Sequence, residues 1–170
     1  MTKHIDVIVP CYNEESSLDR FWKGSGAAFS QIKGYAFRYI FIDDGSTDGT
    51  LDKIRQLASL QDAAKTDAPG APVSPEEFAP QVSYISFSRN FGKEAAMYAG
   101  LQASRGDFAV IIDADLQHPP ELVEKMIRIV EETGCDSCAA RRVSRKGEPK
   151  IRSAFARAFY KLMNRYSDIE

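Results

Sequence analysis

The chain has 170 residues, a net charge of −2, and 44% hydrophobic and 27% charged residues. This composition is typical of one soluble globular domain and excludes a disordered or fibrous chain. No apolar run reaches the roughly 18–20 residues that a membrane span requires. The first strand pattern begins near the N-terminus without a signal-peptide leader, so we expect a cytosolic segment.

Short apolar runs alternate with amphipathic stretches, which predicts an α/β fold with a mostly parallel sheet flanked by helices. Residues 61–81 hold four prolines and no steady period, and we interpret them as an exposed loop or insertion. Ser16 and Asp19 have the spacing of a capping box at the first helix. The expected strands are 5–9, 37–42, 82–87, 108–112 and 136–140, and the expected helices are 16–32, 50–60, 92–104, 119–133 and 151–166.

The three cysteines are too few for a disulfide framework. Cys135 and Cys138 form a C-x-x-C without a second pair or a suitably placed histidine to complete a zinc site. They fall immediately before and within the expected fifth strand, and free cysteine is commonly buried. We therefore interpret both as buried structural residues.

The C-terminal segment is strongly basic. Residues 141–165 contain nine Lys or Arg and one acid, a net +8 that leaves −10 for the rest of the chain. Such a segment suits a phosphorylated ligand or an anionic membrane surface, and a solvated helix face is an equally good explanation. Its apolar stripe, from Ile151 to Tyr166, suits a packing or dimer helix or a membrane-surface helix. We divide the chain into an α/β domain, 1–140, and this basic part, 141–170.

Each expected strand runs directly into polar or charged residues at its carboxyl end. In an open parallel sheet, ligands bind beyond those ends. Five such clusters at one edge therefore predict a binding site. The clusters are Pro10–Glu15, Asp43–Ser46, Ser88–Lys93, Asp113–Asp115 and Arg141–Arg142.

Asp113 and Asp115 are the candidate metal ligands. Carboxylates two residues apart lie on one side of an extended chain, where they repel each other unless a cation lies between them. Oxygen ligands favour Mg²⁺ or Mn²⁺, with diphosphate oxygens completing the shell. Gln117 could add a ligand or a hydrogen bond. His118 either begins the following helix or contacts the metal or the leaving group.

Residues 43–50 hold two consecutive acids in a glycine-rich turn. Ser46 or Thr47 can cap the following helix, but capping does not require both acids. Asp44 is therefore a candidate for reading the N–H groups of a nucleobase. Tyr12 could stack on a base or ribose, and Glu14 could accept hydrogen bonds from ribose hydroxyls.

Cationic side chains at the same edge suit a diphosphate leaving group. Lys93 and Arg142 are the main candidates, with Arg89 and Arg145 as weaker ones. The sequence has no G-x-S-x-G elbow, Walker loop or G-x-G-x-x-G fingerprint. Their absence disfavours kinase, ATPase and dehydrogenase functions.

Three segments in order resemble family 2 glycosyltransferases: residues 9–15 (VPCYNEE), 43–50 (DDGSTDGT) and 113–120 (DADLQHPP). Residues 89–96 (RNFGKEAA), 142–148 and 159–162 narrow the resemblance. They are similar to the polyprenyl-phosphate sugar transferases, a group that includes dolichol-phosphate-mannose-synthase-like and bactoprenol glucosyltransferase enzymes.

The resemblance implies a GT-A, Rossmann-like fold and a metal-dependent, inverting transfer of a sugar to a polyprenyl phosphate. It also implies further catalytic residues and transmembrane helices beyond residue 170, at the cytoplasmic face of the membrane. A UDP-sugar is favoured over GDP-mannose as the donor. The implied nucleotide site is Pro10, Tyr12, Glu14, Asp44 and Lys93; the implied metal ligands are Asp113, Asp115 and Gln117; and the implied catalytic residues are Asp113, Asp115 and Arg142.

Three other interpretations stay open. The acceptor could be a glycan or a soluble molecule, or the chain could be a non-catalytic nucleotide-sugar-binding module. It could also be an interaction protein whose acidic residues merely cap helices. We expect no nucleic-acid partner, and a homo-oligomer is compatible with the final helix.

Overall fold

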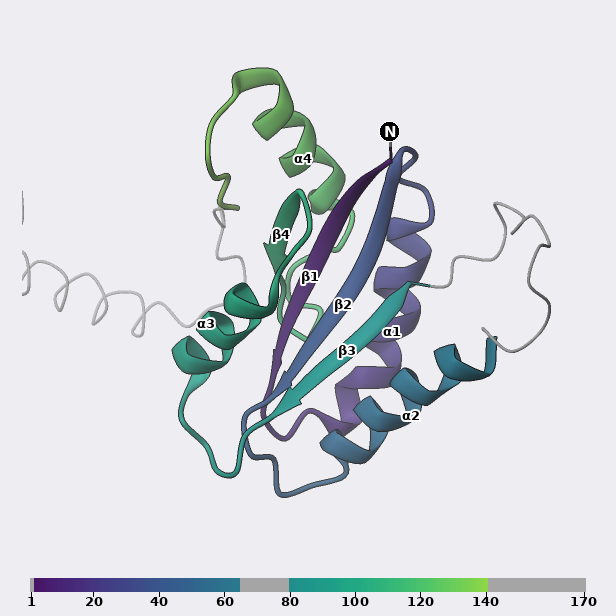
Figure 1. Ribbon diagram of the computed structural model, residues 1–170, viewed down its shortest axis with the longest axis vertical. Coiled ribbons are helices and arrows are strands. Elements are labelled where there is room, and N and C mark those ends of the chain that lie inside the picture. The colour runs from purple at the N-terminus through teal and green to yellow at the C-terminus, as the bar shows by residue number, and fades with distance from the viewer. Residues whose placement is uncertain (1, 65–79, 141–170) are drawn as a thin grey trace, which may run out of the picture. The chain divides into compact units, whose positions relative to one another are not determined.

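The computed structural model describes residues 2–64 and 80–140, and all of its helices and strands belong to one compact unit, residues 1–138. Strands and helices alternate along the chain, as the sequence predicts (Figure 1). The elements are β1 (Lys3–Cys11), α1 (Glu15–Phe29), β2 (Tyr35–Asp43), α2 (Thr50–Ala64), β3 (Gln81–Ser86), α3 (Lys93–Ala103), β4 (Phe108–Ile111) and α4 (Leu122–Thr133).

The described strands form one parallel sheet in the order β3-β2-β1-β4. β1 pairs with β2 from Lys3↔Tyr35 to Cys11↔Asp43, and with β4 from Ile5↔Phe108 to Ile8↔Ile111. Because the strands are parallel, their carboxyl ends meet at one edge, where the arrowheads point in Figure 1. The loops that follow the strands converge there, which confirms the predicted fold class.

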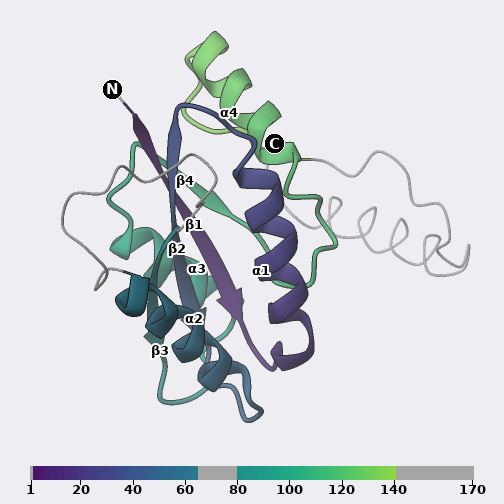
Figure 2. The ribbon, with the colours of Figure 1, turned by 90° about the vertical axis from the view of Figure 1, so that its right-hand side faces the viewer.

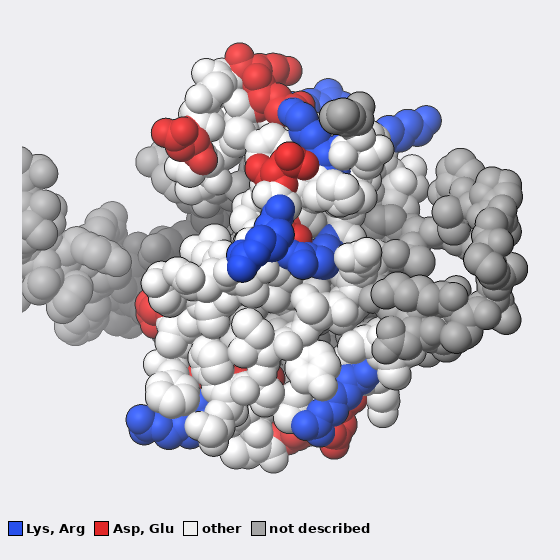
Figure 3. All heavy atoms as spheres, in the orientation of Figure 1, with Lys and Arg blue, Asp and Glu red and all other residues white. Residues whose placement is uncertain are grey.

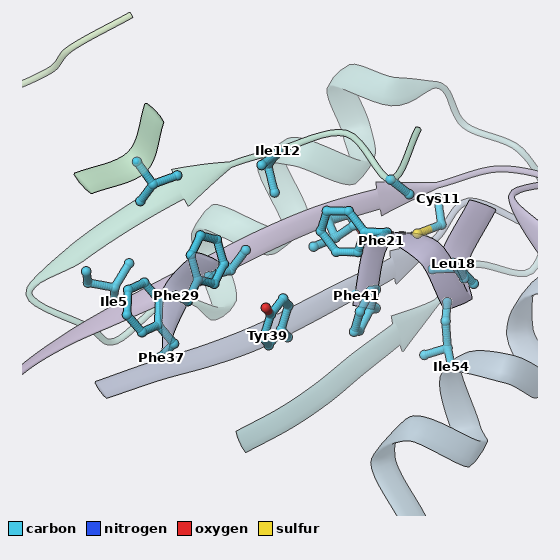
Figure 4. Close-up of a cluster of buried hydrophobic side chains, with 14 of the residues drawn as sticks. Ile5, Cys11, Leu18, Phe21, Phe29, Phe37, Tyr39, Phe41, Ile54 and Ile112 are labelled. Carbon is cyan, nitrogen blue, oxygen red and sulfur yellow. Dashed lines mark hydrogen bonds between the residues drawn. The ribbon is translucent and has the colours of Figure 1, made fainter. Parts of the chain in front are cut away.

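One face of the sheet carries the main core, beneath α1, α2 and α4. Aromatic rings from β2 and α1 interlock there: Phe21 meets Phe41 edge-on at 6.3 Å, and Phe29 stacks on Phe37 at 4.6 Å between centroids (Figure 4). The Tyr39 hydroxyl is buried and donates to Ser25 Oγ at 2.8 Å, so its polar atom is satisfied. This packing holds β1 and β2 rigidly beneath the loops at their ends.

Among the described residues, α3 covers the opposite face, packing on Ile8, Ile40 and Ile42 (Figure 2). Gly100 permits this close approach, because a Cβ atom there would lie 2.3 Å from Ile8 Cγ2. Figure 3 shows this face largely uncharged over α3, with a basic patch near the middle of the view and further charged side chains at its top and bottom. In the part of the chain that the structure describes, no helix is both long enough and apolar enough to cross a membrane.

Two predictions for the cysteine segment are wrong. Residues 134–140 form no strand in the structure, and Cys135 and Cys138 are half-buried rather than buried. α4 ends instead in a left-handed Gly134, whose N–H donates to the Val130 carbonyl at 2.9 Å. The segment that follows is polar at Asp136 and Ser137 and small thereafter, so it has little side-chain surface to pack in a sheet.

The predicted boundaries of α1 and α2 also need correction. α1 begins at Glu15, so Ser16 lies inside the helix, and the N-cap Glu14 makes no side-chain capping bond. The backbone N–H groups of Glu14 and Glu15 donate instead to Thr50, the first residue of α2, and to Asp48 in the loop before it. α2 continues to Ala64, past the predicted end at residue 60. The remainder of the predicted loop, 65–79, and the predicted helix 151–166 lie outside the described residues.

Candidate functional site

A cavity of about 360 Å³ opens at the carboxyl edge of the sheet, among the loops after β1, β2 and β4 and the start of α3. Seven of the predicted site residues line it: Pro10, Tyr12, Glu14, Asp44, Lys93, Asp113 and Asp115. Cys11, Asn90, Gly92, Ala96 and Ala114 complete the lining.

Other predicted site residues lie elsewhere. Gln117 is exposed and outside the lining, and its backbone N–H donates to Asp115 Oδ1 at 2.9 Å. Arg89 lies over the Phe91 ring at 4.6 Å, outside the cavity, and His118 is also exposed and outside the lining. Arg142 and Arg145 lie outside the described residues.

The loop after β1 is joined to the loop after β2 by side-chain hydrogen bonds. Asn13, in a left-handed conformation with φ 55°, accepts from Thr47 N at 2.9 Å and donates its own N–H to Ser46 Oγ at 3.0 Å. Glu15 Oε2 accepts from Gly49 N at 3.0 Å. These bonds fix the backbone on both sides of Tyr12 and Glu14, which leaves those two side chains at the cavity.

Sequence reasoning missed this role of Asn13 and Glu15, because it shows only once the two loops lie side by side. It also predicted a helix cap at Ser46 or Thr47, which is wrong. Asp48 Oδ1 accepts from Thr50 N at 3.0 Å and from the Thr50 hydroxyl. Asp48 is exposed, and although desolvation by its neighbours opposes its ionisation, the Thr50 and Glu15 donors outweigh that effect and lower its pKa.

Tyr12 and Glu14 both line the cavity but differ in how firmly their side chains are held. Tyr12 is 47% exposed, so its ring can accept a planar ring without a change in the core. Glu14 is half-buried, and its carboxylate accepts a hydrogen bond from the Ser17 hydroxyl. The Glu14 side chain is therefore oriented by the first turn of α1.

The Asp44 carboxylate lies at the end of β2 and is only 3% exposed. Its Oδ1 accepts from Phe91 N at 2.7 Å and its Oδ2 from Gly92 N at 2.9 Å. The preceding Asp43 accepts from Ser46 N at 3.1 Å and from the Ser86 hydroxyl at 3.0 Å. Both acids therefore tie the end of β2 to neighbouring loops.

Asp113 and Asp115 both line the cavity, as predicted, and Asp113 Oδ1 lies 2.6 Å from Lys93 Nζ. Within residues 2–64 and 80–140, no three His, Cys, Asp or Glu side chains are grouped to hold a metal ion. Two carboxylates and a diphosphate make a chemically suitable oxygen set for Mg²⁺ or Mn²⁺. The residues present therefore fit a cation that shares its shell with a ligand.

The charge around the cavity is unbalanced. Its lining holds four carboxylates, from Glu14, Asp44, Asp113 and Asp115, against one ammonium, from Lys93. Burial, and then the negative charges of Glu14, Asp43 and Asp113, raise the pKa of the Cys11 thiol. Cys11 is thus a neutral, buried wall residue, and the cavity suits a cation carried with an anionic ligand.

A parallel sheet covered by helices, with a cavity at its carboxyl edge, places the protein in the class of open α/β proteins, whose ligands bind at that edge. Residues 6–169 match the family described as Glycosyl transferase family 2, and the chain belongs to that family. The bactoprenol glucosyl transferase of Shigella phage SfX is 36% identical over 163 residues, which cover 96% of this chain and 47% of that protein. The chain spans about half the length of the curated relatives it matches.

Solved structures share the fold. Mannosyltransferase PcManGT from Pyrobaculum calidifontis, in complex with GDP-Man and Mn²⁺, gives a TM-score of 0.54 at 21% identity, covering 76% of this chain and 33% of that one. S. aureus TarS 1-349 in complex with UDP gives a TM-score of 0.52 at 15% identity, covering 84% of this chain and 39% of that one. The described sheet therefore has the GT-A fold of these glycosyltransferases.

Proposed function

We propose that residues 1–140 form the donor site of a glycosyltransferase that takes a sugar from a nucleotide diphosphate. The observation that carries the proposal is the cavity itself, in which four carboxylates and one ammonium meet at the carboxyl ends of parallel strands. Membership of family 2 gives the reaction class. The bound GDP-Man and UDP of the two solved neighbours support a nucleotide ligand.

In this proposal Tyr12 stacks on the base or ribose, and Glu14 accepts from ribose hydroxyls. Asp113 and Asp115 hold Mg²⁺ or Mn²⁺, which would neutralise charge on the departing diphosphate. Lys93 lies 2.6 Å from Asp113 and can reach the same diphosphate. Arg142 stays a second candidate for that contact.

The transfer is a single displacement. An acceptor oxygen forms a bond to the anomeric carbon as the bond from that carbon to the diphosphate oxygen breaks, and the electron pair leaves with the nucleotide diphosphate. Attack from the opposite side inverts the anomeric centre. A phosphate acceptor is already anionic near neutral pH, so the step needs no strong general base.

We further propose a polyprenyl phosphate as the acceptor, at the cytoplasmic face of a membrane. The name of the phage relative supports a bactoprenol acceptor and a glucosyl group. The family resemblance and the UDP and UDP-GlcNAc complexes of TarS favour a UDP-sugar as the donor. The net +8 of residues 141–165 suits an anionic surface. This acceptor concerns the longer enzymes, of which the chain spans about half.

Calorimetric titration with UDP and GDP, each with and without Mn²⁺, tests the donor site. We expect one nucleotide to bind in a Mn²⁺-dependent way, and Asp115→Ala to weaken that binding about 100-fold, or about 2.7 kcal/mol. Asp19→Ala is the matched control, because Asp19 is an exposed acid on α1 outside the cavity. A folded wild-type chain that binds neither nucleotide would overturn the proposal.

A further inference from the structure

Asp44 differs from the other acids of the cavity in how its carboxylate is used. It is 3% exposed, and its two oxygens accept the consecutive backbone N–H groups of Phe91 and Gly92 at 2.7 and 2.9 Å. We propose that Asp44 is a positioning residue, which holds the turn before α3 so that Lys93 faces the diphosphate. This inference rests on the proposed donor site and deepens it.

The turn concerned, residues 87–92, lies against the end of β2. Gly45 has φ +67°, and a Cβ atom there would lie 2.3 Å from the Arg89 carbonyl carbon, so two backbones meet with no room for a side chain. The Phe87 N–H donates to the Asp43 carbonyl at 2.8 Å at the other end of the turn. Asp44 thus holds the second end of a segment whose first end and middle are already fixed.

The held end of this turn is the start of α3. Gly92 is the N-cap, with φ 97°, and its carbonyl accepts from Ala96 N at 3.1 Å. Lys93 is the first residue of the helix, so the direction of its side chain follows from the position of Gly92. The N-cap makes no side-chain capping bond, and the carboxylate of Asp44 is what fixes its N–H.

This geometry separates two roles for Asp44. A carboxylate that reads the base would matter only for ligands that carry a base. A carboxylate that positions Lys93 would matter equally for pyrophosphate, which has no base. Because a neutral amide offers one acceptor oxygen and a competing NH₂, Asp44→Asn loses one of the two backbone hydrogen bonds.

The experiment is titration of pyrophosphate with Mn²⁺ into wild type, Asp44→Asn, Lys93→Met and the double variant. We expect each single variant to lose about tenfold in affinity, equivalent to about 1.4 kcal/mol. We expect the double variant to lose little more than either, because both changes remove the same contact. A loss of UDP affinity in Asp44→Asn with unchanged pyrophosphate affinity would overturn the inference in favour of base reading.

Asp6→Asn is the control for general destabilisation, because Asp6 is an equally buried carboxylate outside the cavity. It should leave pyrophosphate affinity unchanged, and a matching loss there would make the Asp44 effect merely structural. If Asp44→Asn fails to fold, Gly45→Ala replaces it, since it displaces the turn and keeps the carboxylate. Unchanged pyrophosphate affinity in Gly45→Ala would overturn the inference, whereas no binding by wild type would overturn the donor site itself.

Discussion

Buried carboxylates lie at both ends of the sheet, and their surroundings differ. Asp6, in the first half of β1, is 2% exposed and forms a bidentate pair with Arg38, at 2.8 and 2.7 Å. It also accepts from the Ser104 hydroxyl and from the N–H groups of Arg105 and Gly106. Its charge is fully compensated by the protein.

At the carboxyl edge the compensation is incomplete. Asp44 has two backbone donors, and Asp113 and Asp115 share the cavity with the single ammonium of Lys93. The comparison teaches how to tell a structural carboxylate from a functional one in this fold. A carboxylate paired with its own guanidinium has a structural role in the sheet. A group of carboxylates that outnumber the cationic side chains at an open cavity is suited to bind a metal ion or a cationic group.

Removing the compensated charge should give the largest effect on stability. We expect Asp6→Asn to lower the free energy of unfolding by about 3 kcal/mol at pH 7, because Arg38 would be left without its carboxylate. Burial by itself would raise the pKa of Asp6, but Arg38, Arg105, Gly106 and Ser104 together hold it well below its usual range. Urea denaturation of the wild type and the variant measures the difference.

The pH dependence of this difference follows from that lowered pKa. A carboxyl group whose pKa is lower in the folded state stabilises the fold at pH values above its unfolded-state pKa, which is about 4. This stabilisation is lost as the pH falls towards the folded-state pKa. The gap between wild type and Asp6→Asn should therefore shrink below about pH 4. Asp19→Asn is the control, because Asp19 is 68% exposed in its pair with Lys53 and its loss should matter little. An equal effect at both positions would contradict the comparison.

The sequence was sufficient for the fold because β1 and β2 are buried on both faces and read as apolar runs. Their burial follows from the covering helices, and the four strands predicted at 5–9, 37–42, 82–87 and 108–112 are confirmed. The prediction of a fifth strand at 136–140 is wrong because the side chains of this segment are polar or small and have little surface to pack in a sheet. The predicted capping box is wrong because the backbone N–H groups at the start of α1 donate to Asp48 and Thr50, which lie 33 or more residues away in the sequence.

The candidate site was predictable where a residue follows a strand directly. Tyr12 and Asp44 directly follow β1 and β2, and Asp113 comes two residues after β4; all three line the cavity. The bond from Asp44 to Gly92 was not predictable, because it depends on how closely the backbone at Gly45 approaches residues 89–90. Spacing along the chain carries no information about that approach.

A smaller effect is expected at the exposed aromatic of the cavity. Tyr12→Ala should weaken UDP binding about tenfold, because stacking on a base contributes about 1–3 kcal/mol. Pyrophosphate binding should stay the same, since Tyr12 has no charge to offer it. Tyr98→Ala is the matched control, because Tyr98 is 64% exposed on α3 and does not line the cavity. Equal losses for UDP and pyrophosphate would show that Tyr12 shapes the cavity rather than stacking.

The smallest effect should have opposite signs for two ligands. Lys93 pairs with Asp113 at 2.6 Å, so without nucleotide it competes with a metal ion for that carboxylate. Lys93→Met should therefore raise the affinity for Mn²⁺ alone by about threefold, a modest gain because the pair is partly exposed to solvent. The same variant should weaken Mn²⁺–pyrophosphate binding.

Lys53→Met is the control for this prediction. It breaks a pair with Asp19 outside the cavity and should change neither affinity. Titration at low and high salt sharpens the test, because screening weakens the Lys93–Asp113 pair and so shrinks the gain. A fall in both affinities would mean that Lys93 holds the metal-binding carboxylates in place. Its ammonium would then have a structural role rather than contact the diphosphate.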